Sequence, residues 1–270
     1  MAQGSRSLIR FENDFTAPPG GITTGVPDAL FNNLGGGVGL IGVSEGVLAM
    51  TVDEDGGIID ITTNTNDNDN QALVAGAFKP SSGGMWMECR CKIPDSVATL
   101  RAAVFVGFSE TLAKDTPVMP AETATTTTTY NGTGGMAGFV MDSDATVIAW
   151  RFVAGDAAAA LATKAGPYNG SSLAVGAAGT ALGIIANKDT LTADRWYLFR
   201  VEITPAGHAR GYFGDIGSGR ELALVGETTA ALGSGDCFHA VALIENRSAA
   251  NERLEVDYFE GEGYRDWRAD

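Results

Sequence analysis

The sequence predicts an all-β protein, built as an antiparallel β-sandwich. More than ten short segments carry strand patterns and are separated by turn residues, while helical periodicity of about 3.6 residues is nearly absent. The chain also combines 36 glycines with a charged fraction of only 19%. Many short strands joined by turns are typical of sandwiches. Because sandwiches of this length, 270 residues, commonly form one domain, we expect a single domain.

The clearest pair of strands lies between Asp194 and Asp215. Apolar and polar residues alternate from Tyr197 to Thr204, which is the period of a strand with one buried face. Residues 204–207 (TPAG) then predict a tight turn, because proline favours a φ of about −65° and glycine accepts the left-handed conformation. A second strand, residues 208–213, returns from this turn.

The other strands are expected along the whole chain. In the segment 85–93, Met87, Cys89, Cys91 and Ile93 share one face, and in 102–108 both faces are apolar, as in a central strand. In the last strand, 254–259, the alternation places Tyr258 on the face opposite to Glu255 and Asp257. Residues 121–129, rich in threonine, are predicted to form a loop. The predicted strands are 8–15, 47–52, 58–62, 72–78, 85–93, 102–108, 139–141, 146–153, 197–204, 208–213, 221–225, 237–245 and 254–259.

Residues 1–46 are predicted to form an N-terminal arm, and residues 47–270 the sandwich. Within the arm, residues 8–15 alternate as a strand does. Residues 16–46 are rich in glycine, and we expect an extended segment with little regular structure. The segment is too apolar for a free linker, so we expect it to lie along its own sandwich or along a neighbouring subunit. Its apolar residues are Ile22, Val26, Leu30, Phe31, Leu34, Leu40 and Ile41.

Charge and composition exclude several classes of partner. The net charge of −15 repels phosphate backbones, so nucleic acid is not expected to bind. No run of 18 apolar residues is present, so no membrane span is expected. Residues 1–7 are not followed by an apolar segment, so we expect no secretory signal. An odd cysteine count without such a signal indicates folding in a reducing cytoplasm without disulfides.

Five strand-rich segments occur along the chain: 86–94 (WMECRCKIP), 103–111 (AVFVGFSET), 138–152 (GFVMDSDATVIAWRF), 194–203 (DRWYLFRVEI) and 254–263 (LEVDYFEGEG). Together they resemble the concanavalin-like (laminin-G-like) jelly roll. In order and spacing they are similar to sandwich domains of tailed-phage virion proteins, especially capsid decoration (cement) and head-fibre proteins, over residues 72–267. The resemblance implies a jelly-roll virion protein, made in the host cytoplasm, that decorates the outer capsid surface. It would bind the major capsid protein or other virion subunits as a homo-oligomer, such as a trimer.

Residues 255–260 (EVDYFE) supply an enzymatic alternative. They fit the E-x-D-x-x-E pattern of retaining glycosidases that share this jelly roll, and this resemblance implies Glu255 as nucleophile and Glu260 as acid/base. A bulge at Tyr258 or Phe259 would bring Glu260 to the face of Glu255, and the mechanism needs the two carboxyls about 5–5.5 Å apart. The Trp-Pro…Gly approach of those enzymes is missing, however. We therefore interpret the motif as an exposed acidic face, assign no catalytic residue and expect no enzyme.

Cys89, Cys91, Cys237 and His239 supply the residue types of a zinc site. Residues i and i+2 of a strand share a face, but structural zinc sites use wider spacings. Cys89 and Cys91 also fall on an apolar face, where reduced cysteine behaves as a small core residue. We therefore predict free thiols and no bound zinc.

Other metal and cofactor sites have less support. The acidic segments 53–55 and 67–69 offer oxygen ligands for Ca²⁺ but lack the full spacing of an EF-hand loop. A Ser-His-Asp triad would need His208 or His239, and neither has an orienting partner in the sequence. No glycine-rich phosphate loop precedes a helix. We expect no metal and no cofactor.

Four tryptophans raise the alternative of a carbohydrate-binding module on the virion surface. Their rings would form a platform for sugars. The first three fall in or beside predicted strands, and we predict that they pack in the core or between the sheets instead. The tryptophans are Trp86, Trp150, Trp196 and Trp267.

Overall fold

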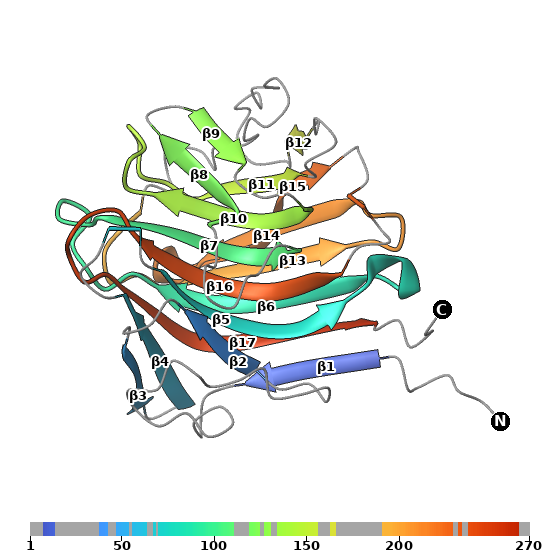
Figure 1. The fold of residues 1–270 in the computed structure, drawn as a ribbon, viewed down its shortest axis with the longest axis horizontal. Helices are drawn as coiled ribbons and strands as arrows, with labels where there is room; N and C mark the ends of the chain where they lie inside the picture. The colour runs from blue at the N-terminus through green and yellow to red at the C-terminus, as the bar shows by residue number, and fades with distance from the viewer. Residues whose placement is uncertain are drawn as a thin grey trace.

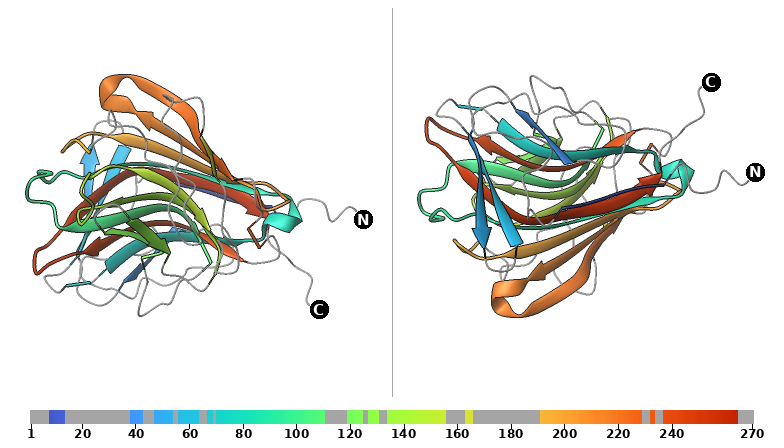
Figure 2. Two further views of the ribbon diagram at one scale, coloured as in Figure 1. Left: turned by 90° about the horizontal axis from the view of Figure 1, so that it is seen from above. Right: turned by 90° about the horizontal axis from the view of Figure 1, so that it is seen from below.

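The protein folds as two antiparallel β-sheets stacked face to face (Figure 1). Figure 2 shows the two sheets as curved layers whose central strands lie along a common axis. The computed structural model describes residues 8–13, 38–42, 47–53, 56–63, 67–68, 70–110, 119–124, 127–130, 134–155, 163–165, 191–228, 232–233 and 237–264.

Within these ranges the larger sheet has nine strands. In spatial order they are β12 (Thr163–Ala165), β15 (Arg220–Thr228), β14 (Ala209–Asp215), β13 (Tyr197–Ile203), β6 (Met85–Lys92), β17 (Arg253–Tyr264), β4 (Gly56–Thr62) and β3 (Val47–Asp53). The ninth strand, β1 (Leu8–Asn13), pairs with β17, from Leu8 opposite Tyr264 to Asn13 opposite Phe259. The long strand β17 therefore pairs with β1, β4 and β6.

The smaller sheet has six strands in the described ranges. Their order is β11 (Arg151–Gly155), β10 (Met136–Asp142), β7 (Ala102–Ser109), β16 (Phe238–Asn246), β5 (Asn70–Phe78) and β2 (Val38–Gly42). A separate hairpin consists of β8 (Ala121–Ala124) and β9 (Thr127–Tyr130). Over the same residues, helical structure is limited to two 3₁₀ turns, Pro80–Ser82 and Ile216–Ser218, and no helix is long and apolar enough to cross a membrane.

The core lies between the two sheets and is rich in aromatic rings. Strands β6 and β13 alternate strictly between buried and partly exposed residues, so one face of each packs inward. Phe199 lies at its centre, with its ring centroid 4.5 Å from that of Trp150, 5.1 Å from Phe139 and 5.5 Å from Phe213. Aromatic pairs at such separations contribute about 0.5–1.5 kcal/mol each beyond the area that they bury.

Two facing glycines make room for one of these rings. Gly211 on β14 and Gly226 on β15 are opposite each other in the register. A Cβ atom at Gly211 would lie 2.2 Å from the ring of Phe152, and one at Gly226 would lie 2.4 Å from it. Because these distances are far below van der Waals contact, the ring of Phe152 reaches its place between the sheets only with glycine at both positions.

The predicted hairpin at 197–213 is confirmed. The N–H of Gly207 donates to the carbonyl of Thr204 at 2.8 Å, and Gly207 has a φ of +84°, in the left-handed region that favours glycine. The register runs from Tyr197 opposite Asp215 to Ile203 opposite Ala209.

Two expectations about irregular segments are wrong. The threonine-rich segment 121–129 contains β8 and most of β9 rather than a loop, because β-branched threonine is well suited to strands. Residues 38–42, inside the segment expected to be an extended arm with little regular structure, form β2 and pair with β5 at the edge of the smaller sheet. The other parts of the segment 16–46 lie outside the described residues, so the proposed arm stays a prediction.

Candidate functional site

The outward-facing side chains of the central strands in the larger sheet form a surface that we call the ring-and-charge face. The same alternation that buries one side of β6 and β13 turns their aromatic and charged residues outward. Strands β14 and β17 extend this surface on either side. Its members are Trp86, Glu88, Arg90, Lys92, Trp196, Leu198, Arg200, Glu202, Arg210, Tyr212, Glu255, Asp257, Tyr258 and Glu260.

The first ring of this face is Trp86, at the start of β6. The guanidinium carbon of Arg200 lies over it, 4.6 Å from the ring centroid. Arg200 Nε donates to Glu202 Oε1 at 2.9 Å, and its Nη1 lies 3.6 Å from Glu88 Oε2. The hydroxyl of Tyr212 donates to the other oxygen of Glu202 at 3.2 Å. Two carboxylates thus fix the guanidinium against the indole, which adds a cation–π attraction.

The second ring is Trp196, directly before β13. The guanidinium carbon of Arg90 lies 5.0 Å from its centroid and Lys92 Nζ lies 4.9 Å from it. Arg90 Nη1 is also 2.9 Å from Asp257 Oδ2 on β17. Both tryptophans therefore combine a partly exposed indole with a cation that is itself bound to a carboxylate.

Lys92 joins two segments of this face. Its Nζ lies 2.7 Å from Asp194 Oδ1 and 2.9 Å from Glu255 Oε2. Burial lowers the pKa of the Lys92 ammonium, but the hydrogen bonds to Asp194 and Glu255 outweigh burial, and the pKa lies above its ordinary value. The ammonium therefore stays charged across the physiological range.

Glu88 is the carboxylate most affected by its surroundings at the centre of the face. It stands opposite Glu260 on β17 and opposite Arg200 on β13. Burial raises the pKa of Glu88, Arg200 lowers it and Glu260 raises it, with a net rise. A second negative charge brought to this position would therefore be repelled.

The motif at 255–260 lies across a β-bulge. The register of β17 against β6 shifts between Val256 and Tyr258. After the shift Phe259 is buried, whereas Tyr258 and Glu260 are partly exposed. The alternation that placed Tyr258 on the face opposite to Glu255 is therefore wrong from Asp257 onward, because the extra residue of the bulge reverses it.

This bulge places Glu255 and Glu260 on one face, as the hydrolase alternative requires. Each carboxylate lies beside a cation, however: Glu255 beside Lys92, and Glu260 Oε2 at 3.7 Å from Arg10 Nη2. The arrangement resembles an ion-pair network more than a catalytic pair.

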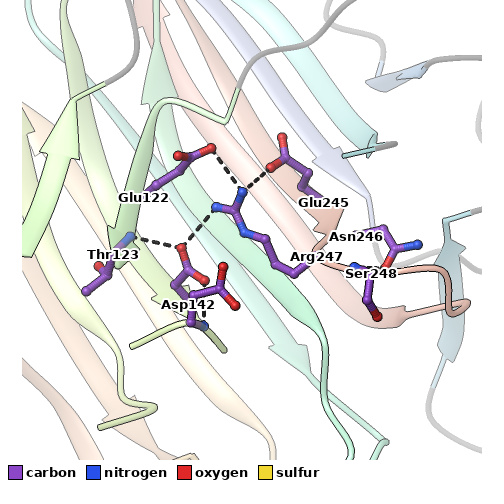
Figure 3. Close-up of polar contacts among 8 residues, drawn as sticks. Glu122, Thr123, Asp142, Glu245, Asn246, Arg247 and Ser248 are labelled. Carbon is purple, nitrogen blue, oxygen red and sulfur yellow. Dashed lines mark hydrogen bonds and ion pairs between the residues drawn. The ribbon is translucent and has the colours of Figure 1, made fainter. Parts of the chain in front are cut away.

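A second polar cluster, the Arg247 cluster, lies at one end of the smaller sheet (Figure 3). Arg247 follows β16, and its Nη1 contacts Glu122 Oε1 on β8 at 3.0 Å and Glu245 Oε1 at 2.6 Å. Its Nη2 contacts Asp142 Oδ2, at the end of β10, at 2.9 Å. The side chains of Arg247, Glu245 and Asp142 are 8%, 7% and 1% exposed. The ion pairs of this cluster connect β8 to the end of the smaller sheet.

Burial dominates the ionisation of this cluster. It raises the pKa of Glu245 to about 7, although Arg247 lowers this pKa; Glu122 raises it further. Burial likewise raises the pKa of Asp142, against the lowering effect of Arg247. Asp142 also accepts the backbone N–H groups of Thr123 at 2.9 Å and of Asp144 at 3.0 Å. These contacts indicate a structural role, which sequence reasoning missed.

The cysteines and histidines occupy separate places. Cys89 and Cys91 are fully buried on the inward face of β6, as the core interpretation predicted, whereas Cys237 is exposed just before β16. His239 Nδ1 lies 2.6 Å from the carbonyl oxygen of Gly76, and burial lowers the pKa of His239. His208 is the residue directly before β14. Among the described residues, no group of three or more histidine, cysteine or acidic side chains is arranged to hold a metal ion.

The tryptophans divide between core and surface. Trp150 is fully buried, as predicted, but Trp86 and Trp196 are partly exposed on the ring-and-charge face, so the prediction that they pack in the core is wrong. Trp86 alternates in step with Glu88 and Arg90, a signal that already indicated the outer face. Trp267 lies outside the described residues, as do residues 54, 55 and 69 of the acidic segments 53–55 and 67–69.

No protein-family model and no curated protein sequence matches the chain. Among solved structures, it is similar to a protein of unknown function from Shewanella oneidensis MR-1, with a TM-score of 0.55 and 13% identity over 98% of this chain and 90% of that one. It is also similar to peanut lectin with a nine-residue peptide, with a TM-score of 0.53 and 9% identity over 96% and 99% of the chains.

These similarities define the class of fold. The chain is a concanavalin-like β-sandwich of the kind seen in legume lectins. A third similar structure comes from a phage: the CBM2 module of the evolved Dit protein of Lactobacillus casei BL23 phage J-1, with a TM-score of 0.50 and 13% identity over 97% of this chain and 99% of that module. At these identities the likeness concerns the fold.

Proposed function

We propose that this chain is a binding module of a phage virion, without catalytic activity, and that its ring-and-charge face binds carbohydrate. The observation that carries the proposal is the pair of partly exposed indoles, Trp86 and Trp196, set among paired charges. The apolar C–H faces of sugars stack on such rings, and their hydroxyls both donate to carboxylates and accept from guanidinium groups.

The structural comparisons support this choice. A lectin and the CBM2 module of a phage Dit protein share the fold of this chain. The association with a virion rests further on the resemblance of residues 72–267 to phage virion sandwiches.

The experiment is a glycan array that includes host cell-wall polysaccharides, followed by calorimetry on every glycan that binds. Trp86→Ala should lose most of the binding, because it removes one stacking surface. Val147→Ala is the matched control, since Val147 is 38% exposed beside the smaller sheet. Absence of binding to every glycan, or equal binding by the Trp86 variant, would refute the proposal.

Capsid decoration is the second candidate function, and the sequence resemblance to cement proteins favours it. In this role the chain would sit on the outer capsid surface as a homo-oligomer, such as a trimer, and bind the major capsid protein. Mixing the purified protein with undecorated shells and sedimenting them tests this role directly. Cosedimentation that Trp86→Ala does not affect would favour cementing through another surface.

Glycoside hydrolysis is the outcome that would overturn the non-catalytic assignment. Release of reducing ends from a polysaccharide, abolished in Glu255→Gln and in Glu260→Gln, would establish it. If the two carboxylates serve only as ion-pair partners, neither variant changes the polysaccharide, and glycan binding persists in both.

A further inference from the structure

We propose that the ring-and-charge face selects an extended, uncharged oligosaccharide that spans both indoles, and that it excludes polyanionic glycans. This inference rests on the proposed carbohydrate binding and adds the class of ligand. Two features of the face support the proposal: the distance between its two indole rings, and the pairing of its cations with carboxylates.

The separation follows from the positions of the rings along β6. Trp86 is the second residue of this strand, whereas the ring of Trp196 lies against Arg90 and Lys92 toward the other end. With a rise of about 3.3 Å per residue, Trp86 and Arg90 are roughly 13 Å apart along the strand. A single sugar ring cannot touch two indoles so far apart, so a ligand that uses both must be a chain of several sugars.

The surface between the two indole rings suits such a chain of sugars. Leu198 lies opposite Arg90 in the register and contributes a partly exposed apolar side chain there. Tyr212 on β14 stands opposite Arg200, and Tyr258 on β17 stands opposite Arg90. A partly exposed tyrosine therefore lies on each side of the surface between the two indoles. These phenols offer further surfaces for sugar rings and further hydroxyl partners.

Three cations of the ring-and-charge face already have anionic partners. Arg200 contacts Glu88 and Glu202, and Lys92 contacts two carboxylates. Arg90 contacts Asp257. A uronate, sulfate or phosphate group would therefore meet cations whose charge is already balanced by these carboxylates.

The charge balance adds to this exclusion. Glu88 and Glu260 stand opposite each other at the centre of the face, and the whole chain carries a net charge of −15. A polyanion is therefore repelled at the face by these carboxylates and at longer range by the net charge of the chain. A sugar hydroxyl avoids this conflict, because it donates to a carboxylate and accepts from a guanidinium without breaking the ion pair between them.

The test uses an array of neutral and acidic glycans of graded length, with calorimetry on neutral hexasaccharides of β-1,4-linked glucose, mannose and N-acetylglucosamine, on their disaccharides, and on hexagalacturonate. We expect binding to at least one neutral hexasaccharide, with affinity at least about tenfold higher than for its disaccharide, and none to hexagalacturonate. Trp86→Ala and Trp196→Ala should each weaken hexasaccharide binding about tenfold or more, while Val147→Ala leaves it unchanged.

The outcomes separate this inference from the function on which it rests. Binding of acidic glycans in preference to neutral ones, equal affinity for disaccharide and hexasaccharide, or loss in only one tryptophan variant would overturn the inference while carbohydrate binding stands. No binding to any glycan would refute the proposed function, and the inference with it. Circular dichroism and melting temperature of each variant establish that a loss of binding does not arise from unfolding.

Discussion

Replacing Arg247 by methionine should destabilise the protein strongly at pH 8. In the folded protein the guanidinium contacts three carboxylates at 2.6–3.0 Å, and two of them, Asp142 and Glu245, have side chains only 1% and 7% exposed. Methionine fills similar volume but leaves these charges buried without their cation. Removing one partner of a buried ion pair costs about 3–5 kcal/mol, which is a large part of an ordinary domain's stability.

The loss should depend on pH in a defined direction. Burial already raises the pKa of Asp142 and raises that of Glu245 to about 7 in the presence of Arg247. Without the cation both pKa values rise further. An acid whose pKa is higher in the folded than in the unfolded protein destabilises the fold above the folded pKa, and this penalty disappears as the pH falls below the unfolded value. The destabilisation should therefore be much smaller at pH 5 than at pH 8.

Urea unfolding followed by circular dichroism at pH 5, 6.5 and 8 measures both effects. Arg210→Met is the matched control, because Arg210 pairs with Glu227 at 3.0 Å and their side chains are 41% and 34% exposed. Exposed pairs contribute about 0.2–1 kcal/mol, so the control should change little at any pH. A loss below about 1 kcal/mol at pH 8 in Arg247→Met, or an equal loss at pH 5 and pH 8, would refute the assignment of a buried, charge-dependent cluster.

Three further changes test the core, the cluster and the thiols. Glu245→Gln should flatten the pH dependence of the free energy of unfolding between pH 4.5 and 8. The rise of the Glu245 pKa to about 7 corresponds to about 3 kcal/mol of that free energy, and an unchanged dependence of the urea midpoint on pH would contradict this. Gly211→Ala should lower stability by about 1–3 kcal/mol, because its Cβ would lie 2.2 Å from the ring of Phe152, and an unaltered melting temperature would count against that packing. Ellman's reagent should titrate Cys237 rapidly in the native protein and the two buried thiols of β6 only after unfolding, whereas rapid reaction of all three would show that β6 does not bury its thiols.

The strands that the sequence predicted best are those in which one face is buried. In β6 and β13 the apolar residues recur at every second position, and the structure alternates in the same phase. The fully apolar segment at 102–108 became β7, whose residues are all buried, at the centre of the smaller sheet. In these cases the polarity of single residues is sufficient to predict the strand, because each side chain faces either the core or the surface.

The features that sequence reasoning missed depend on distant parts of the chain. The hydrolase alternative requires a bulge at Tyr258 or Phe259, and the structure has it at Asp257, because its exact position is a property of the pairing between β17 and β6. The Arg247 cluster joins Arg247 and its near neighbour Glu245 to Glu122 and Asp142, which lie more than 100 residues earlier in the chain. Trp86 differs from these cases, because its place within a strand does not by itself tell the inner face from the outer one, whereas its phase with Glu88 and Arg90 does.

The pairing of β17 has a consequence for how this chain reaches its fold during synthesis. Leu8 pairs with Tyr264, and β17 also supplies the neighbour of both β4 and β6. A ribosome that has made the first 250 residues has therefore released β1, β4 and β6 without the strand that joins them. Pairing across so long a separation is slow, and unpaired strand edges are open to association with other chains meanwhile. The yield of soluble protein should therefore depend on chaperones that shield these edges until residues 253–264 emerge.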